Sequence, residues 1–211
     1  MSETKKISIT EALNELKLYD AKISKAIRQN NYIGAAKKST NLIGVQTKET
    51  FKSNAEAGYQ SVVDLITNRN KIKSAIVKSN AITEVTIDNK SMTVAEAIER
   101  KNSIQFEIDL LNTLKTQYSN ATNNVLNENR KVDQQIDNLL QTFTGRDTDK
   151  KISKEDQAAI TDPYREKNEF ELVDPLGLYD KIQELDSSID GFNSSVNTVL
   201  VLSNATTFID I

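Results

Sequence analysis

The longest uninterrupted helical pattern in this sequence runs from residue 94 to residue 143 and reads VAEAIERKNSIQFEIDLLNTLKTQYSNATNNVLNENRKVDQQIDNLLQTF. It contains no Gly or Pro, and Thr93 with Glu96 has the spacing of a capping box at its start. Apolar side chains recur every seven residues in two companion seams. The first seam comprises Ala97, Ile104, Leu111, Tyr118, Val125, Val132 and Leu139, and the second comprises Ile108, Ile136 and Phe143. This pattern predicts one helix of about 50 residues, roughly 75 Å long, that packs lengthwise against its neighbours.

The second seam is polar in its middle, where Lys115, Thr122 and Asn129 take the apolar positions. Two interpretations of this interruption stay open. Either the helix is partly solvated there, or the neighbouring segment supplies matching polar groups.

Two further helices are expected before this stretch. The first begins at Ser8, which forms a capping-box pair with Glu11, and apolar positions three and four residues apart continue it to about Gln29. Residues 32–56 are ambiguous, because their Gly, Ser, Thr and Lys content suggests a loop. A second helical pattern begins at about Ala57.

The period of the pattern changes after that second helix. Residues 82–87 alternate apolar and polar side chains and predict a strand, which an Asp-Asn-Lys turn returns into a second short strand. Residues 145–174 are polar and predict a loop insertion with a short helix near residues 154–160. A last helix follows Asp174-Pro175, and residues 206–211 again alternate like a strand.

Two stretches of the sequence resemble each other. Residues 77–87, VKSNAITEVTI, align with residues 201–211, VLSNATTFIDI, and six of the eleven positions are identical. We interpret them as a helix–turn–strand unit used twice, with Asn80 and Asn204 as the helix-exit turns, because Asn tolerates the left-handed conformation that ends many helices. The alternative is chance similarity in a chain rich in Asn, Thr and Ile. If both strands leave parallel helix ends, they can join residues 91–93 in a three-stranded sheet with an edge open to a partner strand.

These patterns predict a mainly α fold: an elongated antiparallel helical bundle or coiled coil with one helix of about 50 residues. A small β-sheet, formed by the hairpin 82–93 and the C-terminal strand 206–211, accompanies the bundle. We expect residues 1–211 to form a single elongated helical domain. The predicted packing seam consists of Ile104, Ile108, Leu111, Tyr118, Val125, Val132, Ile136, Leu139, Ile182, Leu185, Ile189 and Phe192.

The composition excludes several classes of site. The chain has no Cys or His, which removes thiolate nucleophiles, Ser-His-Asp triads, disulfides and His/Cys zinc sites. Residues 145–156 space their acidic groups like a calcium loop, but Gly145 stands where a carboxylate ligand is needed and Lys150 where a Gly is needed. We therefore predict no enzyme activity, no catalytic residues, no metal site and no cofactor.

The charge is divided unevenly along the chain. The net charge of −3 argues against nucleic-acid binding, which needs a basic surplus. Residues 1–101 carry 17 basic and 11 acidic side chains, or +6, and residues 102–211 carry 10 basic and 19 acidic ones, or −9. Either the two halves pack against each other as antiparallel helices, or the chain associates head to tail with another copy or a partner under electrostatic steering.

The sequence contains no run of about 18 apolar residues, so we expect no membrane-spanning segment. The first residues lack the apolar core of a signal peptide. We expect the protein in a virion or in the cytoplasm of a host cell.

Four segments share a layout with known proteins: ITEAL at Ile9–Leu13, SNA at Ser79–Ala81, TVAEAIER at Thr93–Arg100 and LDSSI at Leu185–Ile189. Together they resemble the septicolysin-like family of small helical bacterial proteins, whose function is not established. The resemblance implies a helical protein, and similar proteins occur among the structural genes of tailed phages that infect Gram-positive bacteria. The family's name suggests a cytolysin, but the sequence has no amphipathic insertion hairpin that would support pore formation.

We therefore expect a non-enzymatic structural or assembly protein that acts by helix packing and oligomerisation, as a component of a tailed-phage virion. Its partners would be further copies of itself or other virion proteins, with no nucleic acid and no membrane. The alternative is a soluble adaptor or inhibitor that binds one host protein through its helical stalk.

Overall fold

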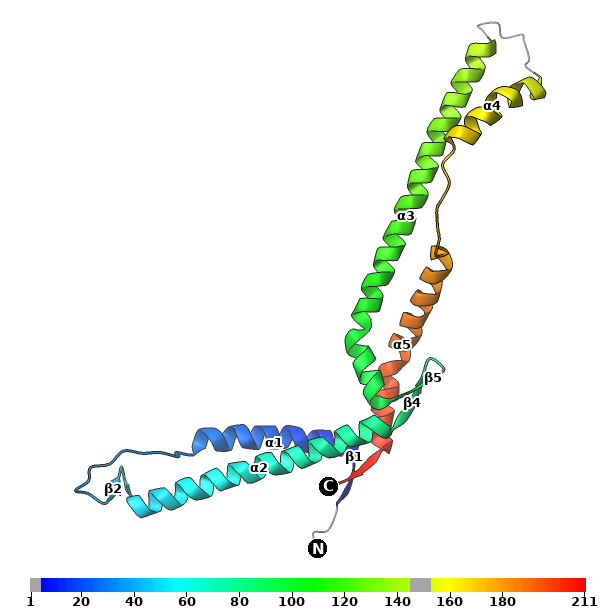
Figure 1. Ribbon diagram of the computed structural model, residues 1–211. Coiled ribbons are helices and arrows are strands. Elements are labelled where there is room, and N and C mark those ends of the chain that lie inside the picture. The colour runs from blue at the N-terminus through cyan, green and yellow to red at the C-terminus, as the bar shows by residue number, and fades with distance from the viewer. Residues whose placement is uncertain (1–4, 145–152) are drawn as a thin grey trace. The chain divides into compact units, whose positions relative to one another are not determined.

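The computed structural model describes residues 5–144 and 153–211 (Figure 1). These residues form five helices and six short strands, which confirms the predicted mainly α fold with small antiparallel sheets. The chain forms two compact units that share two long helices. The first unit comprises Met1–Asn102 and Gly191–Ile211, and the second comprises Ser103–Asp190. The sequence had predicted one elongated domain.

The helix α3 spans Val94–Thr144, 51 residues, and confirms the predicted helix of about 50 residues. The predicted capping box closes its first turn. Thr93 Oγ1 accepts a hydrogen bond from the Glu96 N–H at 3.1 Å, and Glu96 Oε2 accepts one from the Thr93 N–H at 2.7 Å. The second of these bonds, to the backbone N–H, is the main cause that lowers the pKa of the Glu96 carboxyl.

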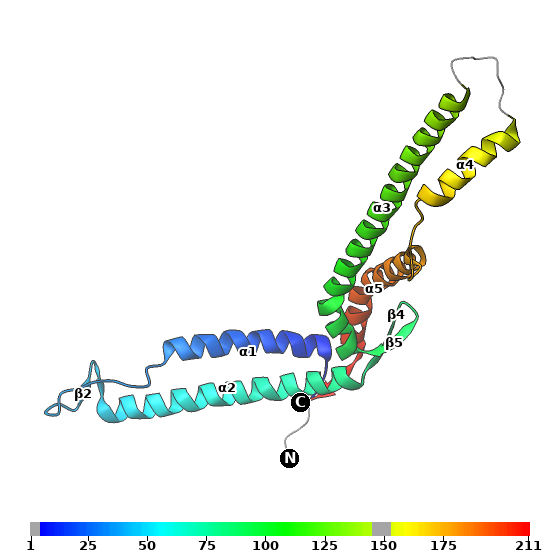
Figure 2. The ribbon, with the colours of Figure 1, turned by 45° about the horizontal axis from the view of Figure 1, so that its top comes forward.

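In the first unit, α1 (Ile9–Gln29) and α2 (Lys48–Ile82) form an antiparallel hairpin, and Figure 2 shows the two helices side by side. The predicted capping box of Ser8 and Glu11 begins α1. The helix α2 begins earlier than predicted, because Thr47 caps it by accepting from the N–H of Thr50. Their buried core comprises Ile7, Ile9, Ala12, Leu16, Ile72, Ile76 and Ile209.

The strands of the described residues form three separate two-stranded sheets, and the predicted three-stranded sheet is not formed. The strands β4 (Glu84–Ile87) and β5 (Lys90–Thr93) form the predicted hairpin, and its turn residues Asp88 and Asn89 both have positive φ. The strand β6 (Phe208–Asp210) does not join this hairpin but pairs with β1 (Lys6–Ser8). The prediction was wrong because a three-residue strand before a capping box has too short a pattern to be recognised. The β1–β6 pairing is favoured because it buries an Ile of each strand in the core.

The helices α2 and α5 (Leu178–Thr206) both end two residues beyond the predicted exit turns. Asn80 and Asn204 lie inside these helices, so the prediction that they form the helix-exit turns was wrong. The exits are at Thr83 and Thr207, whose N–H groups donate to the carbonyls of Ser79 and Ser203, each at 2.9 Å. Thr83 has φ −78° and ψ 119°. A β-branched Thr favours such extended backbone, so no left-handed residue is needed at the exit.

In the second unit, α4 (Lys154–Asn168) and the first part of α5 lie along α3, as both ribbon views show. Ser153 caps the first turn of α4, but the helix continues beyond residue 160, where the sequence predicted its end, and through Pro163. Proline removes one helical hydrogen bond. The continuation past Pro163 is held to α3 by Arg165, whose Nη2 lies 2.8 Å from the Asp133 carboxylate.

Candidate assembly surfaces

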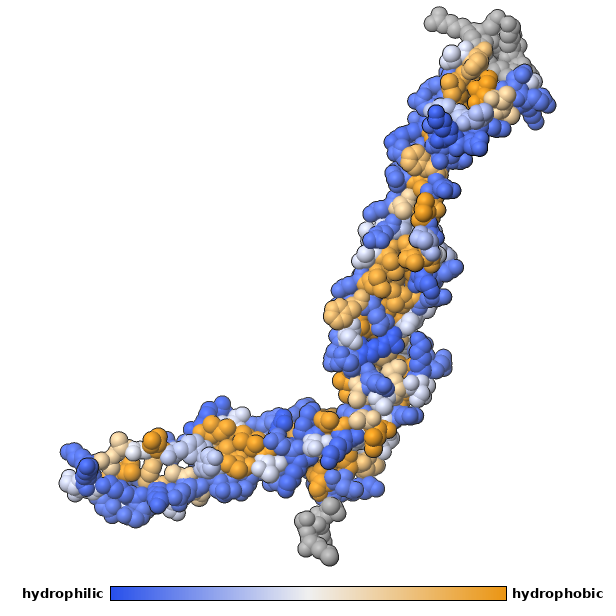
Figure 3. All heavy atoms as spheres, in the orientation of Figure 1, coloured by the Kyte–Doolittle hydropathy of each residue, from blue (hydrophilic) through white to orange (hydrophobic). Residues whose placement is uncertain are grey.

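The predicted packing seam lies mostly between α3 and its two neighbours. All twelve predicted seam residues are buried or half-buried. Phe192 belongs to the first unit, where it is fully buried and the Arg100 guanidinium lies 4.5 Å from the centre of its ring. Phe143, at the end of the heptad pattern, is exposed. On the face drawn in Figure 3, apolar residues gather along α3 and α5 between bands of polar ones.

The polar middle of the seam has partners from the same chain at two of its three positions. Lys115 Nζ lies 2.9 Å from the Asp186 carboxylate on α5. The Asn129 side chain bonds the backbone of Phe170 through both its oxygen and its nitrogen. Thr122 is exposed. The interpretation that a neighbouring segment supplies matching polar groups therefore holds for Lys115 and Asn129, and solvation applies at Thr122.

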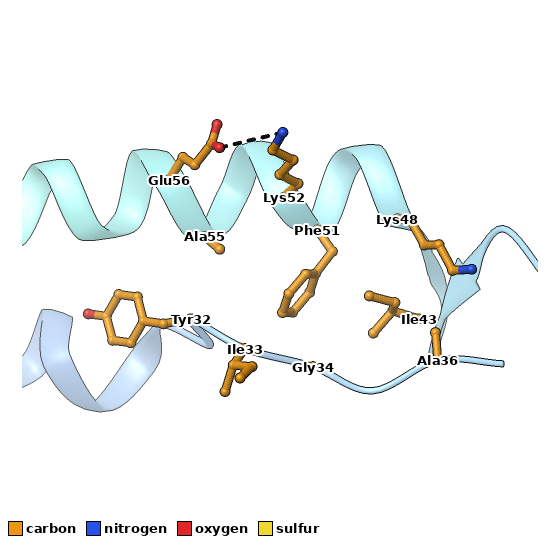
Figure 4. A pocket seen from close by; sticks show the side chains of 10 residues that line it. All are labelled: Tyr32, Ile33, Gly34, Ala36, Ile43, Lys48, Phe51, Lys52, Ala55 and Glu56. Carbon is orange, nitrogen blue, oxygen red and sulfur yellow. Dashed lines mark ion pairs between the residues drawn. The ribbon is translucent and has the colours of Figure 1, made fainter. Parts of the chain in front are cut away.

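A groove lies at the end of the α1–α2 hairpin, where the chain passes from one helix to the other. We call it the tip groove. Its volume is about 550 Å³, and Figure 4 shows the ring of Phe51 between the extended segment that follows α1 and the first turns of α2. The lining residues are Tyr32, Ile33, Gly34, Ala36, Ile43, Lys48, Phe51, Lys52, Ala55 and Glu56.

Short local contacts give the tip groove its shape. The strands β2 (Leu42–Ile43) and β3 (Gln46–Thr47) form a small hairpin, with Gly44 at φ 59° in its turn. Lys48 Nζ donates to the carbonyl of Lys37 at 3.0 Å and ties the segment after α1 to the start of α2. A Cβ at Gly34 would lie 3.1 Å from the Phe51 ring, so only a glycine lets the backbone approach the ring this closely without a shift.

Large apolar side chains are exposed around the tip groove. Ile33 is 90% exposed, Val45 is fully exposed, and Leu42 and Tyr32 are also exposed. The rim also carries the charged side chains of Lys52 and Glu56. Their charged groups lie 3.9 Å apart and form only a loose ion pair. Clustered exposed apolar side chains with a charged rim are typical of a protein interaction site.

A smaller polar cavity of about 360 Å³ adjoins the tip groove and shares the Phe51 side chain with it. Amide side chains dominate its wall: Gln29, Asn30, Asn31, Gln46 and Asn54. Asn54 Nδ2 donates to Gln46 Oε1 at 3.2 Å. Such groups can bond the main chain of a bound peptide, because each amide both donates and accepts.

The second candidate surface is the pair of strands β1 and β6. We call it the clasp and define it as residues Lys5–Ser8 with Phe208–Ile211. Lys5 and Ile211 exchange two backbone hydrogen bonds of 3.1 Å, so the pairing continues beyond the strands. Lys5 Nζ also lies 2.7 Å from the Glu15 carboxylate, and this hydrogen bond raises the pKa of Lys5.

Sequence reasoning missed both surfaces. The tip groove falls in residues 32–56, where no periodic pattern exists, although Phe51, Ile43 and Ile33 among polar residues were a signal of clustering. The strand β1 was missed as well. The capping box at Ser8 matches the one at Thr93, and a short strand leads into each box. Because the strand before Thr93 was predicted, this match was the available signal for a strand before Ser8.

The described residues contain no group of three acidic side chains placed to hold a metal ion. Most of the calcium-loop-like stretch, residues 145–152, lies outside the described residues. Among the helices of residues 5–144 and 153–211, none is long and apolar enough to cross a membrane. The carboxyl groups of Glu11, Glu49 and Glu96 have lowered pKa values, each caused first by a hydrogen bond from a backbone N–H at a helix start, and all three lie on the surface.

No family model, no curated protein and no solved structure matches this chain. The resemblance to the septicolysin-like family therefore stays a prediction.

Proposed function

We propose that this chain is a non-enzymatic structural or assembly protein that associates with further copies of itself. Its proposed setting, a tailed-phage virion, depends on the resemblance described above. The architecture supports an assembly function, since a 51-residue helix flanked lengthwise by α4 and α5 provides a long lateral surface.

The observation that carries the proposal is the opposite charge of the two compact units. The first unit has 17 basic and 12 acidic side chains, a net +5, and the second has 10 basic and 18 acidic, a net −8. The helical hairpins form within each half of the sequence, since α1 pairs with α2 and α3 pairs with α4 and α5. Opposite charges on separate units favour a head-to-tail contact between two copies.

Charge alone steers an encounter but contributes little to affinity, because exposed ion pairs are worth about 0–1 kcal/mol each. A stable contact also needs apolar anchors that lose their water on binding. The tip groove supplies such anchors on the basic unit, with Ile33 and Phe51 next to Lys48 and Lys52.

Mass photometry of the purified chain at micromolar concentration tests self-association. A discrete multimer is expected, and Ile33→Asp should reduce its population because a charge replaces an exposed anchor. Val173→Asp is the matched control, since Val173 is also exposed but lies outside the tip groove. A monomer at every concentration tested would contradict the proposal. Proteomics of purified virions tests the phage setting separately.

The alternative is an adaptor or inhibitor that binds one host protein. The position of the tip groove favours it, because a groove at the end of one helical hairpin suits one-to-one binding. A chain that stays monomeric and binds a host protein with a 1:1 stoichiometry, sensitive to Ile33→Asp, would replace the assembly proposal.

A further inference from the structure

The clasp and the β4–β5 hairpin are the same structure built twice in the first unit. In the hairpin, Glu84 faces Thr93 and Val85 faces Met92. In the clasp, Phe208 faces Ser8 and Ile209 faces Ile7. These pairs occupy corresponding positions of the two aligned stretches 77–87 and 201–211, so the register is identical.

The equivalence extends into the helices on both sides. The carbonyl of Thr83 accepts from the N–H of Val94, the first residue of α3, at 2.8 Å. The carbonyl of Thr207 accepts from the N–H of Ile9, the first residue of α1, at 2.9 Å. Both following helices begin with a capping box.

Burial follows the same correspondence. Ser79 and Ser203 are both 9% exposed, and Ala12 and Ala97 are both completely buried. Similar polar and apolar environments at matched positions favour a unit used twice over a chance likeness of composition.

The chain consists, on this basis, of two equivalent halves that exchange strands. Each half begins with a strand (β1 or β5), continues with a helical hairpin, and ends with a strand (β4 or β6). The strand β4 of the first half pairs with β5 of the second half. The strand β6 of the second half pairs with β1 of the first half. Two strand pairings, β4–β5 and β1–β6, therefore join the halves, in the manner of a closed ring with two members.

The two joints of this ring differ in one respect. The β4–β5 joint is covalent, because the turn at Asp88 and Asn89 links its strands. The clasp has no such turn, since β1 and β6 are connected only through the whole helical part of the sequence. Opening the clasp therefore breaks no covalent bond and leaves β1 and β6 each without its partner strand.

We infer that the clasp is an exchangeable joint through which copies of this chain connect head to tail, with β6 of one copy paired to β1 of the next. The occupant is a second copy because the register and the caps already fit this chain's own strand. This inference goes beyond the charge-steered contact of the proposed function. Both clasp strands belong to the basic first unit, so the clasp is a second, separate contact between copies. A heterologous joint of this kind produces larger rings or filaments.

The closed and exchanged forms contain the same hydrogen bonds and bury the same Ile7 and Ile209 side chains. Their balance is therefore set by concentration. Intramolecular closure acts like an effective concentration, so exchange should increase with the protein concentration.

The chain has no cysteine, which allows a clean test by disulfide trapping. Lys6 and Asp210 face each other across the clasp and are both exposed. A double variant, Lys6→Cys with Asp210→Cys, should form a disulfide within one chain and shows that the geometry permits the bond. The single variants Lys6→Cys and Asp210→Cys are then mixed as full chains, across a wide range of concentration, in a thiol–disulfide buffer.

The expected result is a disulfide between the two different variants. Its amount should exceed that of the disulfide-linked homodimers, which form by random collision, and it should increase with protein concentration. Thr86→Cys mixed with Ser91→Cys is the matched control. These exposed residues occupy the corresponding pair of the covalent hairpin, and their mixture should give at least tenfold less of the interchain disulfide.

A mixture of the clasp variants with no excess of the mixed disulfide at any concentration would overturn the inference, provided that the double variant closes within one chain. Mass photometry of the same wild-type protein separates the two proposals. Multimers without clasp exchange would leave the assembly proposal standing on another surface, and monomers without exchange would remove both.

Discussion

The side chain of Asn129 holds the backbone of Phe170 with two hydrogen bonds: its Nδ2 donates to the Phe170 carbonyl at 2.9 Å, and its Oδ1 accepts from the Phe170 N–H at 2.7 Å. Phe170 lies in the irregular segment between α4 and α5. A polar residue at a seam position of α3 thus holds the backbone of the segment between α4 and α5. Asn suits this role because one amide matches both backbone groups.

Replacing Asn129 by Leu should release the segment around Phe170. The substitution restores the heptad pattern but leaves two backbone groups without their partner, at a cost of about 1–2 kcal/mol. Hydrogen exchange of the Phe170 amide should become faster, while Asn123→Leu, at an exposed position of the same helix, should leave it unchanged. Unchanged protection in the Asn129→Leu protein would show that these bonds do not hold the segment.

Replacing Leu111 by Asp should destabilise the second unit by roughly 3 kcal/mol or more, because it puts a charge at a seam position that is 5% exposed. The neighbouring Leu110 is 52% exposed on the same helix, so Leu110→Asp is the matched control and should change stability little. Thermal unfolding followed by circular dichroism measures both. Equal effects of the two substitutions would mean that the seam is not packed.

Acid should weaken the two capping boxes. The N–H groups of Ser8 and Thr93 lower the pKa values of Glu11 and Glu96 below the ordinary carboxyl value in the folded state. A lowered folded-state pKa contributes stability that is present above the unfolded pKa and is lost as pH falls through the folded pKa. The melting temperature should therefore decrease below about pH 4.5.

A Glu11→Gln, Glu96→Gln double variant tests this cause, because Gln keeps the capping geometry but does not titrate. Its melting temperature should depend less on pH in the acid range than that of the wild type. Parallel acid profiles for the two proteins would rule out the capping carboxylates as the source of the acid sensitivity.

Gly191 on α5 and Asp88 in the hairpin turn should be energetically coupled. A Cβ at Gly191 would lie 2.5 Å from Asp88 Oδ1, so the carboxylate must move to admit it. Gly191→Ala gains up to about 1 kcal/mol of helix propensity, but this gain should appear fully only in an Asp88→Gly background, where the side chain is gone and the positive φ is still allowed. Additive effects in a double-mutant cycle would contradict the coupling.

The elements with short-range signals were predictable from the sequence. Ser8 with Glu11 and Thr93 with Glu96 located two helix starts, the heptads located α3, and Asp88-Asn89 located the hairpin turn. Each of these signals depends on residues within a few positions of one another, because caps and tight turns are made by local hydrogen bonds.

The features that escaped prediction depend on contacts between distant residues. The partner of Lys115 is Asp186, and the partner of β1 is β6 at the other end of the described chain. Asn80 and Asn204 were assigned to exit turns from propensity alone, but the hydrogen bonds of Thr83 and Thr207 to Ser79 and Ser203 extend both helices. The tip groove arises from irregular backbone that no period describes.

Sedimentation velocity at increasing ionic strength tests most directly whether copies of this chain assemble through oppositely charged units. At 0.1 M salt the screening length is about 10 Å and it shortens as salt rises, so an electrostatic contact between exposed groups must weaken. A discrete multimer is expected at low salt, and it should dissociate toward monomer as salt is added. A single monomeric boundary at every salt concentration, at micromolar protein, would contradict assembly through these units.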